Sequence, residues 1–303
     1  IQMNRRTALF SALGTLMTVS ANTSPAAPLA GTDAFKSLTP SARLPVLFLG
    51  HGSPMNAIED NEYRRAWQTL GAEFGVKYPR PQLILCISAH WLTRGWWLTA
   101  MPKPKTIHDF GGFPQALFDQ QYPAPGAPLA AREISSLFKV PPVGLDPQAW
   151  GFDHGSWSVI KPMFPNADIP MLQLSIDYDR PVAEHFALGQ QLKALRERGV
   201  LIVGSGNTVH NLRAVRRDMP TMQAYDWAIE FDRFTADRIG EGDLAGLAGF
   251  QKLGRVAQMA HPTYDHFLPL LYSAGAVDVK ESFRFFNASY QMGAIAMRSV
   301  VWG

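Results

Sequence analysis

Short apolar runs alternate with longer segments of mixed polarity from about residue 44 to the end of the chain. The runs are short, most are rich in β-branched or aromatic residues, and Gly or Pro flanks them, which predicts β-strands. The predicted strands lie at 45–50, 82–89, 96–101, 170–176, 199–206, 283–290 and 296–302.

Three of the segments between these runs have the features of helices. Residues 61–75 follow Asp60, a residue type that caps helix N-termini, and residues 181–199 carry a proline near their start and a glycine at their end. Residues 224–242 can bring their large apolar side chains to one face. Those side chains are Trp227, Phe231, Phe234 and Ile239.

Continuous apolar strands that alternate with helices predict an α/β fold with a sheet covered on both faces. We therefore expect a single three-layer α/β/α domain over residues 43–303. The last two predicted strands follow one another without a helix, so the sheet is expected to be mostly parallel or mixed. In such folds, ligands bind where strands end and loops begin.

The composition is that of an ordinary globular protein, with 303 residues, 47% of them hydrophobic and 17% charged. The net charge of +3 is spread thinly. Its one local cluster is Arg213, Arg216 and Arg217, which lacks interleaved aromatic residues and therefore predicts a solvated surface patch and no nucleic-acid partner. The single cysteine, Cys86, lies in an apolar run and predicts a buried thiol.

The N-terminal segment resembles an export signal. It contains the pair Arg5-Arg6, an apolar stretch too short to span a bilayer, and small residues at 19–21 that suit cleavage. This pattern predicts a twin-arginine-type signal over 1–21, followed by an unstructured linker over 22–42. The expected location is periplasmic or exported if the signal functions, with no membrane contact in the mature form. With an incidental basic leader instead, the location would be cytoplasmic.

Three histidines stand at or near the ends of apolar strands. His51 follows the first predicted strand in GHGSP, His90 ends the second in SAHW, and His210 follows a strand and a glycine turn in GSGNTVH. Two histidines at separate strand ends are a common route to a metal site on an α/β scaffold, so the set favours a mononuclear metal centre. Further candidate histidines are His154, His261 and His266.

The remaining two histidines have other expected roles. His108 lies in the Gly- and Pro-rich loop TIHDFGGFP, where a structural role in the loop and a contact with substrate are equally good interpretations. His185 lies inside the predicted helix at 181–199, on or beside its apolar face, and is expected to be a core or boundary residue.

Seven motifs together resemble the class III extradiol ring-cleavage dioxygenases. In chain order they are LFLGHGSP, SAHW, HDFGGFP, DHGSW, GSGNTVHNL, HPTYDHFLPLL and MRSVV. The resemblance extends from Leu44 to the C-terminus, and the most similar branch is the one named for DOPA 4,5-dioxygenase. It implies a non-haem Fe(II) enzyme that inserts both atoms of O2 into a catechol and opens the ring beside its two hydroxyls.

The resemblance also implies a metal site. It assigns His51 and His90 as metal ligands, whereas the third ligand departs from the wider superfamily, which uses a Glu there. Here we expect His266 to be the third ligand, with His261 and Asp265 as the alternatives. Because three neutral imidazoles donate less charge than a set with one carboxylate, Zn(II) is a second candidate for the bound metal beside Fe(II).

Further residues receive roles through the resemblance. His210 matches the acid–base histidine, with a fourth metal ligand in the substrate-free state as its alternative role. His154 matches a second pocket histidine that would bond to the substrate or to dioxygen; its alternative is a hydrogen bond to a backbone carbonyl that fixes the loop. The aromatic residues expected either to contact the substrate or to belong to the core are Phe110, Phe113 and Trp157.

Two other functions compete with the dioxygenase. The first is a zinc-dependent hydrolase on the same scaffold, in which a metal-bound water attacks an ester or an amide. The second is a non-enzymatic metal-binding or interaction module, as regarded for the Memo-like relatives of this scaffold. The sequence leaves the identity of the catechol and the oligomeric state open.

Overall fold

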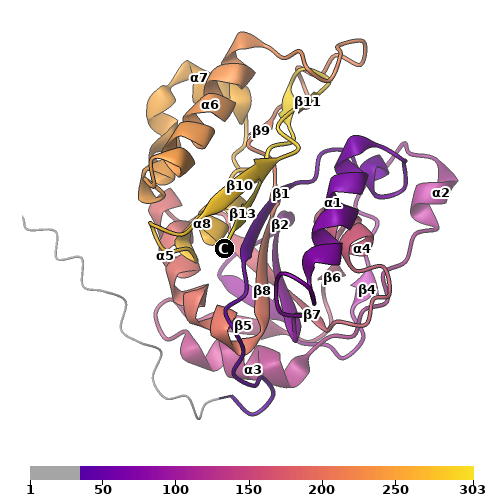
Figure 1. Ribbon diagram of the computed structural model, residues 1–303, viewed down its shortest axis with the longest axis vertical. Helices are drawn as coiled ribbons and strands as arrows, with labels where there is room; N and C mark the ends of the chain where they lie inside the picture. Colours follow the sequence, from indigo (N-terminus) through magenta and orange to yellow (C-terminus); the bar gives the residue numbers. More distant parts are fainter. Residues whose placement is uncertain (1–34) are drawn as a thin grey trace, which may run out of the picture.

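Eight strands form a mixed sheet at the centre of the computed structural model, which describes residues 35–303 (Figure 1). Their order across the sheet is β10-β13-β1-β8-β2-β7-β3-β5. In the middle of the sheet β1, β8, β2 and β7 are parallel, whereas β13 runs antiparallel to β1 and to β10, which confirms the mixed sheet. The bounds are Val46–Gly50 (β1), Leu83–Thr93 (β2), Trp96–Thr99 (β3), Val143–Asp146 (β5), Met171–Asp177 (β7), Val200–Gly206 (β8), Phe283–Phe286 (β10) and Ser299–Trp302 (β13).

Both faces of the sheet are covered, as the apolar strands predicted. Along β1, Leu47 and Leu49 belong to one hydrophobic cluster, while Val46 and Phe48 belong to the other, because successive side chains point to opposite faces. Figure 1 shows helices on each side of the strands, which confirms three layers. One face is covered by α1 (Glu62–Glu73) and α4 (His154–Met163), and the other by α3 (Pro128–Leu137), α5 (Val182–Leu192), α6 (Asp226–Gly240) and α8 (Leu268–Gly275).

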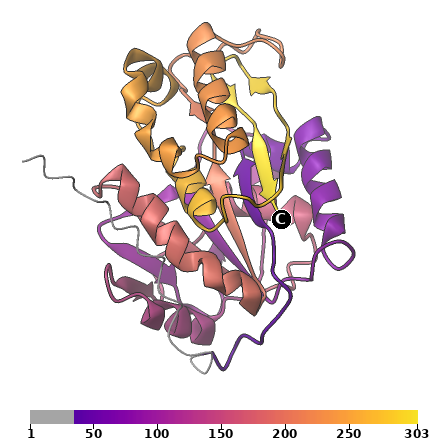
Figure 2. The ribbon, with the colours of Figure 1, turned by 60° about the vertical axis from the view of Figure 1, so that its left-hand side comes forward.

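The smaller elements gather mainly around the ends of this sheet. Figure 2 shows α6 beside α7 and the C-terminal strands. A small sheet joins β11, β12 and β9, and a second one pairs β4 with β6. The bounds are β4 (Lys105–Thr106), α2 (Gln115–Phe118), β6 (Gly151–Phe152), β9 (Val209–His210), α7 (Arg255–Ala260), β11 (Tyr290–Gln291) and β12 (Ile295–Ala296), with 3-10 helices η2 (Pro54–Ala57), η3 (Lys193–Arg198) and η4 (Ala245–Leu253).

Helix α8 is buried along its whole length, and this burial fixes the chain just before it. It packs against α5 and β8. A methyl group at Gly189 in α5 would overlap the backbone of Tyr272 in α8, so only glycine allows the two helices this close. The position of α8 therefore determines where the preceding residues, among them His266, enter the site.

Several strands end elsewhere than the sequence pattern predicted. The strand predicted at 96–101 ends at Thr99, and of that predicted at 296–302 only Ser299–Trp302 forms β13. Strand β2 continues past His90 to Thr93, with a register shift against β7 between Ile87 and Leu92. The predicted strand at 283–290 ends at Phe286, because Asn287 adopts a positive φ of 50° that breaks the extended chain.

The helices differ from the prediction at two ends. Helix α1 is capped by Asn61, whose side chain accepts from the Arg64 backbone N–H at 3.0 Å. Asp60, the predicted cap, instead accepts from the Arg65 guanidinium. The predicted helix at 181–199 is α-helical only to Leu192 and continues as a 3-10 helix.

The predicted signal over 1–21 and most of the predicted linker lie outside the described residues and stay predictions. The last part of that linker, 35–42, forms no helix or strand but is bound to the domain. Leu38 is buried, and the backbone N–H groups of Lys36 and Ser37 donate to the Glu133 carboxylate. Within residues 35–303, no helix combines the length and apolar character needed to cross a bilayer.

Candidate metal centre and active site

His51 is positioned by the meeting of two parallel strands. It is the first residue after β1, and its backbone N–H donates at 3.0 Å to the carbonyl of Gly206, the last residue of β8. Since β1, β8 and β2 are parallel neighbours, their carboxyl ends meet at the same edge of the sheet. The side chain of His51 is buried there.

His90 reaches the same edge from within β2. The pairing of β2 with β7 shifts register between Ile87 and Leu92, so His90 lies in an irregular stretch of the strand. The Nε2 atom of His90 lies 3.3 Å from Nε2 of His51. The sequence pattern predicted His90 at the end of this strand, whereas the strand continues to Thr93.

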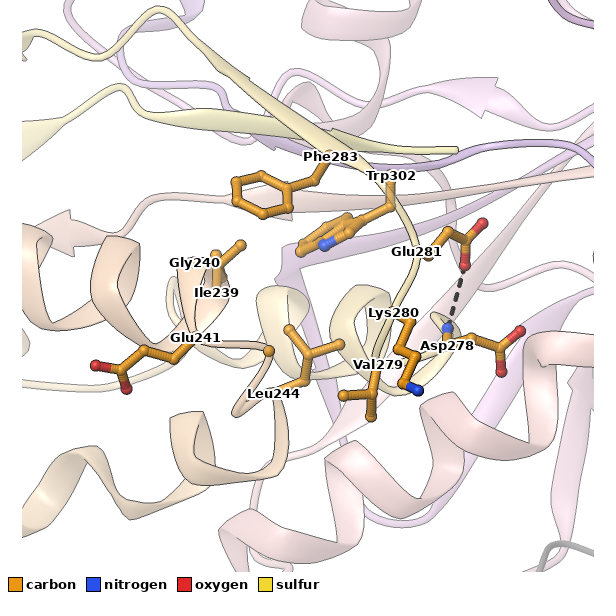
Figure 3. A pocket seen from close by; sticks show the side chains of 11 residues that line it. Ile239, Gly240, Glu241, Leu244, Asp278, Val279, Lys280, Glu281, Phe283 and Trp302 are labelled. Atoms are coloured by element: carbon orange, nitrogen blue, oxygen red, sulfur yellow. Dashed lines mark hydrogen bonds between the residues drawn. The ribbon is translucent and has the colours of Figure 1, made fainter.

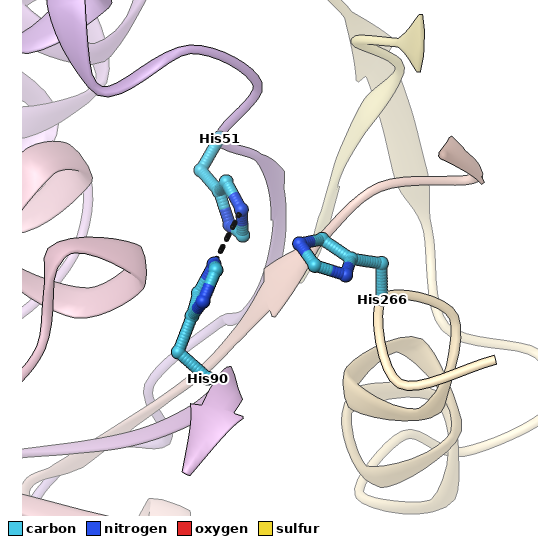
Figure 4. Close-up of side chains that lie close together, drawn as sticks. All are labelled: His51, His90 and His266. Carbon is cyan, nitrogen blue, oxygen red and sulfur yellow. Dashed lines mark hydrogen bonds between the residues drawn. The ribbon is translucent and has the colours of Figure 1, made fainter. Parts of the chain in front are cut away.

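His266 arrives from the other side, in the segment between α7 and α8. Its carbonyl accepts from the Asn207 backbone N–H at 2.9 Å, which ties this segment to the end of β8. The ring centroid of His266 lies 5.2 Å from that of His51 and 5.0 Å from that of His90. Each of these three histidines offers one ring nitrogen within 4.8 Å of the others, and Figure 4 shows their rings converging.

Ser205 fixes the orientation of the His51 ring on the side away from His90. The Nδ1 atom of His51 lies 3.0 Å from the hydroxyl oxygen of Ser205. Because that hydroxyl donates its hydrogen to the Gly155 carbonyl, it accepts from His51 Nδ1. The ring is then the Nδ1–H tautomer, with the lone pair on Nε2 facing His90.

Carboxylates face the Nδ1 atoms of the other two rings, those of His266 and His90. His266 Nδ1 donates to Asp265 at 2.6 Å, and His90 Nδ1 lies 3.4 Å from Asp109. Burial opposes the ionisation of Asp109, but its hydrogen bonds with His154 prevail and lower its pKa to about 2. A histidine whose Nδ1 faces a carboxylate keeps its Nε2 lone pair for a metal.

These three residues fit a divalent transition metal. The buried Nε2 of His266 has no hydrogen-bond partner among the described residues. Two nitrogens bound to one ion at 2.0–2.1 Å lie about 3.0–3.4 Å apart, which matches the separation of the His51 and His90 atoms. Burial, together with repulsion from neighbouring histidines, holds the pKa values of His51 and His266 well below their usual range and lowers that of His90 to about 3. All three are therefore neutral imidazoles, which suit Fe(II) and Zn(II).

The two alternatives for the third ligand lie outside this group of nitrogens. His261 is buried among phenylalanines, and its Nε2 pairs with the Thr208 carbonyl at 2.8 Å. The Asp265 carboxylate is used by the His266 ring.

His210 stands directly beside the three histidines. It ends β9, and its ring stacks on that of His266 with centroids 3.5 Å apart. It is not a member of the group whose nitrogens lie within 4.8 Å of one another. Burial lowers the pKa of His210 to about 4, so the ring is neutral at pH 7 and able to accept a proton.

His154 flanks the opposite side, next to His90. It is the first residue of α4, and the two ring centroids lie 4.0 Å apart. Its Nδ1 and its backbone N–H both donate to Asp109 Oδ1, each at 2.9 Å. The partner is thus a carboxylate, where one sequence-based alternative was a backbone carbonyl.

The loop that carries Asp109 also carries part of the predicted aromatic wall. Phe110 packs edge-on against His154 with ring centroids 5.5 Å apart, and Phe113 packs against Phe110 at 5.5 Å. Both phenylalanines are partly exposed beside the histidines. They remain suitable contacts for an aromatic substrate.

Two other residues predicted to contact substrate support this loop. The Nε2 atom of His108 pairs with the Gln120 carbonyl at 2.8 Å, which favours a structural role in the loop. Trp157 is fully buried, and its indole N–H donates to the Ile107 carbonyl at 2.9 Å. This burial argues against direct contact between Trp157 and a substrate.

Sequence reasoning missed three residues that hold the site together: Asp109, Ser205 and Gln291. The Gln291 side chain accepts from the Ser53 backbone N–H at 3.1 Å and from the Asn56 amide at 3.3 Å. It thereby braces the loop after His51 from the other end of the chain. The sequence signals for Asp109 were its place next to a candidate histidine and within the motif HDFGGFP.

A pocket of about 230 Å³ lies away from this centre (Figure 3). It is formed by the end of α6, the segment before β10, and residues of β10 and β13, and none of its lining residues is a histidine. Its lining mixes apolar and charged side chains, such as Phe283 and Lys280. The chemistry of the histidine cluster therefore has no counterpart in this pocket.

Comparison with known proteins gives a consistent picture. Residues 45–299 match the family described as the catalytic LigB subunit of aromatic ring-opening dioxygenase. The 4,5-DOPA dioxygenase extradiol of Escherichia coli K12 is 49% identical over 87% of this chain and 96% of its own length, and that of Portulaca grandiflora is 34% identical over 83% and 93%. An uncharacterized Escherichia coli K12 protein of known crystal structure superposes with a TM-score of 0.73, at 42% identity over 86% of this chain and 100% of that one.

Proposed function

The chain belongs to the LigB family of aromatic ring-opening dioxygenases and is a non-haem extradiol dioxygenase, and we propose that it uses Fe(II) and O2 to open a catechol of the DOPA kind. The observation that carries the proposal is the convergence of three Nε2 lone pairs from His51, His90 and His266. Each ring has its Nδ1 turned toward a protein oxygen. The DOPA-like substrate is suggested by the names of the relatives from Escherichia coli and Portulaca grandiflora.

His51, His90 and His266 would hold the metal on one face. A divalent iron bound there would supply a site at which a catechol and O2 meet as neighbours. The three side chains come from three separate segments, each tied to the end of β8 or to β2. This scaffold keeps the ligands in place when substrate enters and leaves.

His210 and His154 would handle protons on either side. His210 is neutral at pH 7, so it can take the proton of a catechol hydroxyl and return it later. His154 is oriented by Asp109 through Nδ1, so its Nε2 lone pair is available to accept a hydrogen bond from a substrate hydroxyl. Phe110 and Phe113 would pack against the aromatic ring of the substrate.

A reconstitution experiment tests this function. The protein is stripped with a chelator under anaerobic conditions and reloaded with Fe(II) or Zn(II), and O2 uptake is followed with DOPA and other catechols. We expect uptake and a coloured ring-opened product with Fe(II) alone, and loss of both in His90→Ala. The exposed variant Gln68→Ala serves as the control and should behave as wild type.

Three outcomes would count against the proposal. Ester or amide hydrolysis with Zn(II) and indifference to O2 would indicate the hydrolase. Stoichiometric metal without turnover of any catechol would indicate a metal-binding module. Uptake with other catechols but not with DOPA would leave the reaction standing and contradict the proposed substrate.

A further inference from the structure

A single carboxylate contacts two histidines of the site. Oδ1 of Asp109 accepts from Nδ1 and from the backbone N–H of His154, each at 2.9 Å, while Oδ2 lies 3.4 Å from Nδ1 of His90. In the part of the chain that the structure describes, the ion-pair contacts of Asp109 are to these two imidazoles alone, with no Lys or Arg. The carboxylate is therefore directed wholly at the site.

We propose that Asp109 is a positioning residue that fixes the tautomers of His90 and His154 together and supplies the metal centre with negative charge. The inference rests on the proposed function, because it takes His90 as a metal ligand. It deepens that function by naming the group that couples the metal ligand to the flanking histidine.

The acceptors of the Asp109 carboxylate determine the tautomers of His90 and His154. A carboxylate only accepts hydrogen bonds, so the His154 Nδ1 atom that bonds to it carries hydrogen. The negative charge also favours hydrogen on the His90 Nδ1 atom, 3.4 Å from Oδ2, and both Nε2 atoms then keep a lone pair. An asparagine at this position offers one oxygen and one NH2 group. With its oxygen on His154, its NH2 would face His90 Nδ1, which must then accept. The hydrogen of His90 would move to Nε2, the atom that the metal needs.

The three proposed ligands determine how much negative charge reaches the metal directly. Three neutral imidazoles bring no negative charge to a divalent ion, whereas a set with a carboxylate ligand brings one. Asp109 and Asp265 each stand one imidazole away, behind His90 and His266. Carboxylates in this position raise the basicity of the histidine they contact. Asp109 and Asp265 therefore supply the site with the negative charge that its three neutral ligands do not carry.

The test compares three Asp→Asn variants by their metal affinity. Asp109→Asn and Asp265→Asn each remove a carboxylate that faces Nδ1 of a proposed ligand. Asp119→Asn is the matched control, since Asp119 is exposed and its carboxylate accepts, within residues 35–303, from the Gln115 side chain alone. The dissociation constants of Zn(II) and Fe(II) are measured by chelator competition. We expect both site variants to bind metal about 10- to 100-fold more weakly, and the control to match wild type.

The second readout separates Asp109 from Asp265. Imidazole 15N chemical shifts report which ring nitrogen carries the hydrogen. In wild type we expect Nδ1–H for His90 and His154, and in Asp109→Asn we expect one of them to switch to Nε2–H. Asp265→Asn should leave both unchanged, because Asp265 bonds to His266.

Two results would overturn the inference. One is a folded Asp109→Asn protein with wild-type metal affinity. The other is an Nε2–H tautomer at His90 or His154 in the wild-type protein, a measurement that holds even if the variant fails to fold. A wild-type protein that binds metal but opens no catechol would instead overturn the proposed function. The comparison of metal affinities between wild type and Asp109→Asn would still test the positioning role of Asp109.

Discussion

The rings of His210 and His266 lie face to face, with centroids 3.5 Å apart and planes within 3° of parallel. The stack covers one face of the His266 ring, while Asp265 fixes its Nδ1 edge. A proposed metal ligand and a proposed proton carrier are therefore in direct contact, although they come from different elements. Their separate roles can be distinguished because only His266 belongs to the group of converging nitrogens.

Replacing each partner of the stack should give different results. His266→Ala removes a ligand, so we expect weak metal binding and no turnover. His210→Ala should keep the metal, since three ligands remain, but lower turnover by about 10²- to 10⁴-fold through the loss of proton transfer. Metal content by elemental analysis and O2 uptake provide the two measurements. Loss of metal from His210→Ala to the same degree would show that His210 is itself a ligand.

Gln291→Ala should loosen the loop that follows His51. The change leaves the Ser53 backbone N–H without its partner and removes one of the two acceptors of the Asn56 amide, which still donates to the His51 carbonyl, at a cost of about 1–3 kcal/mol in the free energy of unfolding. We also expect weaker metal binding, because the loop orients His51. Urea unfolding and chelator competition measure the two effects. An unchanged metal affinity would contradict the bracing role, with Gln68→Ala as the exposed control.

Gly155→Ala should disturb His90 through steric overlap alone. A methyl group there would meet the Ser88 hydroxyl and lie 2.8 Å from Cδ2 of the His90 ring. Overpacking of this kind costs about 1–3 kcal/mol, and here the His90 ring must move. We expect lower metal affinity in a folded protein. Gly111→Ala, at a position with no neighbouring atoms within 4 Å, is the matched control.

The stability of the protein should fall as the solution is acidified below pH 6.5. Burial lowers the pKa of His185 to about 4, whereas an unfolded chain keeps it near 6.5. Between these values the unfolded state binds more protons, so the free energy of unfolding decreases as pH falls through this window, by at most about 1.4 kcal/mol per pH unit for one histidine.

His185→Gln tests that contribution. The residue lies in the core with Nδ1 on the Tyr272 hydroxyl at 2.7 Å, away from the metal centre. Its replacement should lower stability near pH 7 by removing this bond, but also flatten the decline between pH 6.5 and 4, so that the difference from wild type narrows as pH falls. The check is a series of urea unfolding curves across this range. If the free energy of unfolding of the variant fell with pH as steeply as that of wild type, His185 would not titrate in this range.

The sequence predicted those parts of the fold that depend on local pattern. Strand β1 and most of β8 are apolar and flanked by glycine or proline, so their ends, and with them His51, could be located. Helix α4 was missed because nearly all of its side chains are buried and Pro162 lies inside it, so it shows no polar face. Strand β5 was missed because it is a short edge strand that follows two prolines.

The contacts behind the histidines could not be predicted in the same way. Asp109 meets His90 and His154 only because a loop, an irregular stretch of β2 and the start of a helix come together. The same holds for Ser205, whose hydroxyl lies between His51 and the carbonyl of Gly155. No spacing along the chain encodes such contacts, whereas strand ends and residue types do suggest which histidines bind metal.

The His51 loop depends on the very end of the chain. Its strand β1 lies between β8 and the last strand, β13, and its loop is held by Gln291. During synthesis, His51 is made long before these supports, which are absent until the chain has been extended through β13. We therefore expect a chain that stops before Gln291 to be metal-free, so that metal loading follows the synthesis of β13.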